Sequence, residues 1–116
     1  VYTIVPNTMP RIFGKGQEAA DSASPLKHVS GNEPPFLILY ADKDFPTIDR
    51  MSENLFEALK KKKVAVSCVT MKDRNHIDSI MKIATNEAEP GTQAMLEFIA
   101  KHSGMKLKPR EEKKKE

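Results

Sequence analysis

Two short polar clusters, each following an apolar run, hold the side chains best suited to proton transfer. The sequence Ala-Asp-Lys-Asp at positions 41–44 follows the run Phe36–Tyr40, and Asp-Arg-Asn-His at positions 73–76 follows the run Val64–Thr70. A carboxylate that accepts the imidazole N–H of a histidine fixes its tautomer and stabilises the imidazolium formed during proton transfer. An aspartate of the first cluster could therefore form an acid–base pair with His76.

A strand-helix-strand unit is predicted to position these clusters. Phe36–Tyr40 is a continuous apolar run, too short for a typical helix, and indicates a buried parallel strand. Val64–Thr70 is rich in β-branched residues and indicates a second strand, while residues 47–62 repeat apolar side chains at the spacing of an amphipathic helix. A right-handed crossover places the carboxyl ends of both strands at one edge of the sheet. Because neighbouring strands lie about 4.8 Å apart, an aspartate of the first cluster and His76 could touch.

Further helices are predicted on both sides of this unit. Gln17–Ser22 indicates a short helix between irregular connections. Two more helices are expected at Ile77–Ala84 and Gly91–Ser103, with Gly104 suited to a left-handed C-cap. The fold class is therefore α/β, with parallel strands and flanking helices. Two parallel strands leave two open edges, so we expect an incomplete sheet that self-associates or pairs with strands of a longer chain.

Composition and charge describe one globular core. The 116 residues are 39% hydrophobic and 30% charged, typical of a single folded domain. Bases outnumber acids by 19 to 16, but six bases and three acids lie in residues 105–116, which leaves 13 of each in residues 1–104. A neutral body argues against nucleic acid as a partner, and no apolar run is long enough to span a membrane. The single cysteine, Cys68, slightly favours a reducing, cytoplasmic compartment.

The stretch Ser22–His102 resembles the C-terminal part of an α/β-hydrolase of the esterase/lipase type, a family that includes carboxylesterases and hormone-sensitive-lipase-like enzymes. Three segments carry the resemblance: Ser24-Pro25-Leu26 with His28-Val29 before the penultimate core strands, Pro35–Asp44 at the strand and acid turn, and Asn75-His76 at the histidine turn. The resemblance implies that Asp44, in preference to Asp42, is the acid of a catalytic triad and that His76 is its base.

The nucleophile that this resemblance implies is not found in the sequence. No Gly-x-Ser-x-Gly motif occurs in the chain. We therefore expect a C-terminal segment of a serine-dependent carboxylic ester hydrolase, inactive alone, whose intact form acts on a small-molecule ester without a cofactor. By the same resemblance, residues 1–13 belong to a cap or to the wall of the acyl pocket, where Tyr2, Ile4 and Phe13 could meet substrate.

Other interpretations stay open. The aspartates after the first strand could be turn or helix-capping residues, and His76 an ordinary loop histidine. Asp73, His76 and Asp78 could bind a hard cation, although three clustered ligands are a weak signal. The main alternative function is a non-catalytic interaction domain that docks on a partner through Phe36–Tyr40. In either case we divide the chain into a linker or cap-derived segment (1–23), a core portion (24–104) and a disordered charged tail (105–116).

Overall fold

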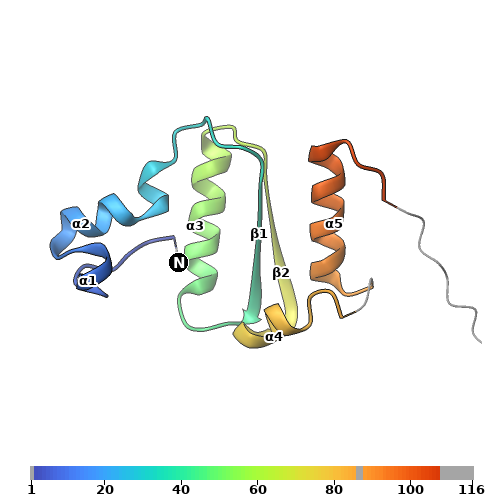
Figure 1. Cartoon of the computed structure of the whole chain (residues 1–116), viewed down its shortest axis with the longest axis horizontal. Coiled ribbons are helices and arrows are strands. Elements are labelled where there is room, and N and C mark those ends of the chain that lie inside the picture. The colour runs from blue at the N-terminus through green and yellow to red at the C-terminus, as the bar shows by residue number, and fades with distance from the viewer. Residues whose placement is uncertain (1, 86–87, 108–116) are drawn as a thin grey trace, which may run out of the picture.

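A parallel pair of strands forms the centre of the molecule and is covered by one helix on each face (Figure 1). The computed structural model describes residues 2–85 and 88–107. Within them β1 (Phe36–Lys43) pairs with β2 (Val66–Asn75), and α3 (Ile48–Lys61) connects the two strands. α5 (Pro90–Ser103) lies on the opposite face from α3 (Figure 1). The predicted α/β class and the strand-helix-strand unit are confirmed.

Both strands continue further than the sequence predicts. The pairing runs from Phe36 opposite Val66 to Ala41 opposite Met71, and after a register shift it resumes with Lys43 opposite Asn75. The polar clusters that we expected to follow the strands therefore lie mostly within them. A side-chain contact explains this extension of the strands. The Asp42 carboxylate accepts hydrogen bonds from the backbone of β2 across the register shift.

The core lies between the sheet and α3. Ile38, Leu55, Leu59 and Val64 form a buried apolar cluster, with partly buried side chains packed around it. Two of these residues come from the apolar stripe of α3, so the periodicity that predicts the helix also predicts the face that it buries. This cluster fixes how β1 and β2 lie against the crossover helix.

The segment before the sheet is more ordered than expected. It contains α1 (Pro10–Phe13), α2 (Gly16–Ala23) and a 3₁₀ turn, η1 (Pro25–His28), where we expected irregular connections outside the predicted short helix. The buried hydroxyl of Ser24 explains part of this order. It donates to the carbonyl of Ala20 at 2.7 Å and accepts the amide of Ile4 at 2.7 Å, which ties the N-terminal segment to the end of α2.

Two helices follow β2. α4 (His76–Met81) begins at the predicted histidine turn and is shorter than predicted, and Gly104 ends α5 with the expected left-handed conformation, φ 72°. In the part of the chain that the structure describes, none of the helices is long and apolar enough to cross a bilayer. Most of the tail predicted to be disordered, residues 108–116, lies outside the described residues.

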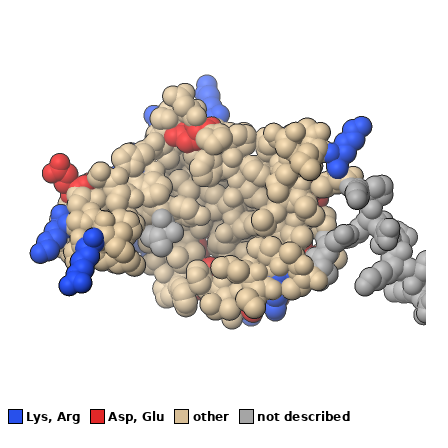
Figure 2. Space-filling view, in the orientation of Figure 1, with Lys and Arg blue, Asp and Glu red and all other residues tan. Residues whose placement is uncertain are grey.

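Charged side chains lie mainly around the periphery of the face shown in Figure 2. The lysines and arginines visible there are at the two ends of the molecule, at its upper edge and along its lower rim, and the middle is largely uncharged (Figure 2). On this face the bases therefore do not gather into one continuous patch.

Candidate functional site

Asp44 and His76 meet at the carboxyl edge of the sheet. His76 Nδ1 lies 2.8 Å from Asp44 Oδ1, the carboxyl side chain is only 6% exposed, and the imidazole is 43% exposed. An ionised carboxylate can only accept a hydrogen bond, so in this pair Nδ1 carries the proton and its N–H donates to Asp44 Oδ1. This leaves the lone pair of Nε2 available to take up a second proton, as a general base requires.

Local hydrogen bonds hold Asp44 at the end of β1. Its amide donates to the carbonyl of Ala41 at 3.3 Å, and its Oδ1 also accepts the amide of Phe45 at 2.8 Å. The chain then passes through Thr47, whose φ of 78° is left-handed, before α3 begins. The Asp44 carboxylate thus lies between the end of β1 and the start of α4, where it meets His76.

His76 is held by the first turn of α4. The Asn75 side chain caps this helix by accepting the amide of Asp78 at 2.8 Å. The carbonyl of His76 accepts the hydroxyl of Ser79 at 2.6 Å, and the ring of Phe45 stacks on the imidazole with a centroid distance of 4.7 Å. The imidazole therefore has a neighbour on its face as well as on its Nδ1 edge.

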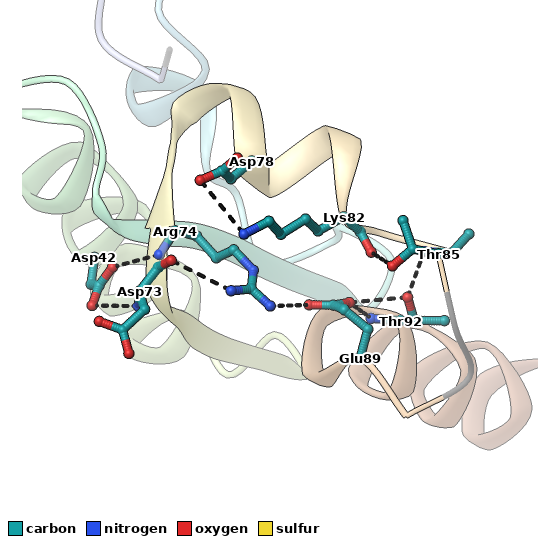
Figure 3. Close-up of polar contacts among 9 residues, drawn as sticks. Asp42, Asp73, Arg74, Asp78, Lys82, Thr85, Glu89 and Thr92 are labelled. Atoms are coloured by element: carbon teal, nitrogen blue, oxygen red, sulfur yellow. Dashed lines mark hydrogen bonds and ion pairs between the residues drawn. The ribbon is translucent and has the colours of Figure 1, made fainter.

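The other candidate acid, Asp42, contacts the backbone. Its Oδ2 accepts the amide of Asp73 at 2.9 Å and its Oδ1 accepts the amide of Arg74 at 3.1 Å (Figure 3). The amide of Asp73 above all, and that of Arg74 after it, lower the pKa of Asp42 against its ordinary value of 3.8. The two aspartates of the first cluster thus have different partners, and the one hydrogen-bonded to His76 is Asp44.

Sequence reasoning missed a polar cluster beside this site. The guanidinium of Arg74 lies 3.9 Å from the carboxylate of Glu89, which is 5% exposed and precedes α5 (Figure 3). Glu89 also accepts the amide of Thr92 at 2.7 Å and its hydroxyl at 3.0 Å. Burial raises the pKa of Glu89, but the amides of Thr92 and Gly91 outweigh it and leave this pKa below its ordinary value. A glutamate just before Pro90 is a sequence signal for a helix start that could have identified this cap.

A cavity of about 200 Å³ adjoins the pair. It is lined by side chains from the N-terminal segment, the sheet, α3 and α4: Tyr2, Leu39, Tyr40, Asp44, Ile48, Met51, Ser52, His76 and Ser79. Of the three residues expected in an acyl pocket, Tyr2 lines this cavity, whereas Ile4 and Phe13 do not. Burial, followed by the nearby Cys68 thiol, raises the pKa of Tyr2 and favours its neutral phenol.

The interpretation of Asp73, His76 and Asp78 as a cation site is not supported. Within residues 2–85 and 88–107, no three acidic, histidine or cysteine side chains are grouped closely enough to hold a metal ion. Asp73 lies instead 3.4 Å from the ammonium of Lys43, and Asp78 lies 3.9 Å from that of Lys82. Each of these two aspartates is therefore paired with a lysine, and His76 with Asp44.

Comparison with known proteins identifies the class of the fold. Over 93% of its length, the chain matches the solved structure of Thermogutta terrifontis esterase 2 phosphoramylated by tabun, with a TM-score of 0.66 and 18% sequence identity. The chain spans 40% of the length of that esterase. It is thus a partial α/β-hydrolase fold, and the resemblance stated from the sequence is confirmed.

The family is given by a match over most of the chain. Residues 7–106 match the prolyl oligopeptidase family, Peptidase_S9. The chain belongs to this family of serine hydrolases. Among curated proteins, none matches it significantly. The family match thus agrees with the α/β-hydrolase resemblance expected from the sequence, while hydrolytic activity, ester specificity and the catalytic roles of Asp44 and His76 stay predictions.

Proposed function

We propose that this chain supplies the acid and the base of a serine hydrolase active site. The observation that carries the proposal is the 2.8 Å contact between His76 Nδ1 and the nearly buried Asp44 carboxylate at the carboxyl edge of the sheet. Membership of the prolyl oligopeptidase family supports the class of reaction. The nucleophilic serine comes from a part of the enzyme that lies outside this sequence.

The proposed mechanism uses each nitrogen of His76 for one task. Nε2 accepts the proton of the serine hydroxyl as the serine oxygen attacks the substrate carbonyl, and then gives that proton to the departing alcohol or amine. Nε2 next takes a proton from the water that attacks the acyl-enzyme, and returns this proton to the serine oxygen as the acid is released. Throughout, the Asp44 carboxylate accepts the hydrogen bond from Nδ1–H and stabilises the positive charge on the protonated ring.

We propose a carboxylic ester as the substrate class. The structural relative is an esterase, whereas the family name indicates a peptidase, so the scissile bond is the point to be tested. The cavity beside the pair is lined partly by Leu39, Ile48 and Met51 and has a volume of about 200 Å³, which suits a small apolar group. We place the acyl group of the ester there.

The decisive experiment replaces His76 in the natural longer chain that contains this sequence. We expect His76→Ala to lower kcat for p-nitrophenyl acetate about a thousandfold or more, and Asp44→Asn to lower it by a similar factor. His102→Ala is the matched control, because His102 also contacts an aromatic ring, that of Phe98, but lies on α5. Full activity of a folded His76→Ala enzyme would contradict the proposal.

The same experiment separates the alternatives. If His76→Ala abolishes hydrolysis of a peptide anilide but the enzyme never cleaves the ester, the catalytic roles stand and the substrate class is wrong. If neither substrate is cleaved and the chain remains folded and self-associating, the interaction-domain hypothesis replaces the enzyme. The 116-residue chain alone is expected to be inactive in both assays, because it lacks the Gly-x-Ser-x-Gly motif.

A further inference from the structure

A second carboxylate, that of Asp42, joins the two chain segments that carry Asp44 and His76. Asp42 lies near the end of β1, two residues before Asp44. Its two oxygens accept the amides of Asp73 and Arg74 near the end of β2, at 2.9 and 3.1 Å (Figure 3). The second of these amides lies two residues before His76. One side chain thus bridges the strands within two residues of each member of the pair.

The bridge lies where the regular ladder fails. The strands lose their register between Ala41 and Lys43, and three residues of β2 oppose a single residue of β1 there. Asp73 has a left-handed φ of 56°, which turns its backbone away from the strand direction. In a bulge of this kind the ladder alone does not set the distance between the strands, so the carboxylate supplies the missing connection.

The turn before His76 is also fixed from the other side. The guanidinium of Arg74 lies 3.9 Å from the buried carboxylate of Glu89 and 3.4 Å from the carbonyl of Asp73. Glu89 in turn caps α5 through Thr92. The backbone of Arg74 is therefore held toward β1 by Asp42 while its side chain is held toward α5.

We propose that Asp42 is a positioning residue, whose carboxylate clamps the strand ends so that His76 stays within hydrogen-bonding distance of Asp44. The inference rests on the proposed function, in which that hydrogen bond orients the base. Because a displacement of about 1 Å in a catalytic group can cost about a hundredfold in rate, a clamp on the backbone has a catalytic consequence without touching substrate. The bidentate geometry requires two acceptors, which a carboxylate has and a carboxamide lacks.

The test is Asp42→Asn in the natural longer chain. The amide keeps the size of the side chain but turns an N–H₂ group toward one of the two backbone N–H groups, so one half of the clamp becomes repulsive. We expect Asp42→Asn to lower kcat by about tenfold to a hundredfold with KM little changed. Asp42→Ala should lower kcat by at least the same factor. Asp21→Asn is the matched control, since Asp21 accepts a hydrogen bond from Gln17 on α2.

A second readout reports on the pair without turnover. The ring ¹⁵N shifts of His76 report its tautomer and its Nδ1 hydrogen bond, and they should change in Asp42→Asn but not in Asp21→Asn. An Asp42→Asn enzyme with wild-type kcat would contradict the proposed positioning role of Asp42. A lowered kcat with unchanged ¹⁵N shifts of His76 would contradict it as well. If Asp42→Ala does not fold, the isosteric Asp42→Asn decides alone.

The outcome for Asp42 is distinguishable from that for the proposed function. If His76→Ala abolishes activity while Asp42→Asn retains it, the clamp is wrong and the triad roles stand. If His76→Ala is fully active, the proposed function fails, and the ¹⁵N shifts still show whether Asp42 holds the Asp44–His76 contact.

Discussion

The two faces of the sheet are covered in different ways. On the α3 face, Leu55 and Leu59 are 4% and 1% exposed and join Ile38 and Val64 in a closed apolar cluster. On α5, the residues Met95, Leu96 and Ile99 are 37%, 37% and 47% exposed. A cavity of about 210 Å³ also lies between that helix and the sheet, lined by Leu37, Val69 and Phe98 among others. The closed apolar cluster of the molecule therefore lies on the α3 face.

Polar contacts at one end fix α5 instead. The buried Glu89 caps its first turn, and the hydroxyl of Thr92 accepts the amide of Ala84 at 2.7 Å from the preceding loop (Figure 3). Glu89 also faces the guanidinium of Arg74, at the end of β2. The α3 face should therefore respond to lost apolar volume, and the α5 face to lost charge. The chain spans 40% of the length of its structural relative. Its own residues nevertheless form the buried apolar cluster between α3 and the sheet.

The largest expected effect is on the α3 face. Leu59→Ala removes a side chain that is 1% exposed and leaves a cavity inside the core cluster. We expect the free energy of unfolding to fall by about 3 kcal/mol, the middle of the range for buried leucines. Urea unfolding followed by far-ultraviolet circular dichroism measures this. A loss below about 1 kcal/mol would mean that the α3 face is not closed.

A smaller loss is expected where the contacts are polar. Glu89→Ala removes the cap of α5 and takes the carboxylate away from the Arg74 guanidinium. The buried Nε of that guanidinium has no hydrogen-bond partner among the described residues. The two effects together should cost about 2 kcal/mol, with the loss of hydrogen-exchange protection concentrated in α5. Glu97→Ala, at an exposed position of the same helix, is the control. Equal protection of α5 in both variants would show that the cap does not hold the helix.

The sequence predicts the α3 face better than the α5 face for a physical reason. The apolar spacing of α3 and the apolar run of β1 are local patterns, and together they predict both the elements and the surface that they bury. The contact of Asp44 with His76 could also be foreseen, because parallel strands end at a shared edge. In contrast, the extension of both strands depends on Asp42 reaching amides 31 and 32 residues away. The pairing of Arg74 with Glu89 likewise depends on where α5 docks, which no local pattern encodes.

Acid should weaken the α5 face selectively. The pKa of Glu89 in the folded chain is below its ordinary value of 4.5, because the amides of Thr92 and Gly91 outweigh the opposing effect of burial. The folded state therefore binds this proton less readily than the unfolded state does. The stabilisation is fully present above the unfolded pKa, near 4.5, and is lost as the pH falls through the lower folded value.

Urea midpoints measured between pH 7 and pH 3 test this sign. For the wild-type chain, the urea concentration at the unfolding midpoint should decrease as the pH is lowered below 4.5. The decrease should be smaller for Glu89→Gln, which has no charge to lose at this position. Glu33 contributes in the same direction, since backbone hydrogen bonds from Ser30 and Gly31 lower its pKa to about 2. Glu33→Gln is therefore needed as a second reference. If the urea midpoint depends on pH identically in the wild type and in Glu89→Gln, the charge of Glu89 does not stabilise the docking of α5.

The smallest effect is expected from the exact counterpart of the first change. Leu96→Ala removes the same atoms as Leu59→Ala, but from a side chain that is 37% exposed on α5. Less apolar area returns to water, no closed cavity forms, and alanine is the better helix former, so the net cost should stay below about 1 kcal/mol. The difference between the two leucines, measured by the same urea titration, isolates packing from residue type. If Leu96→Ala cost as much as Leu59→Ala, the two faces would be equally closed and the contrast between apolar and polar docking would not hold.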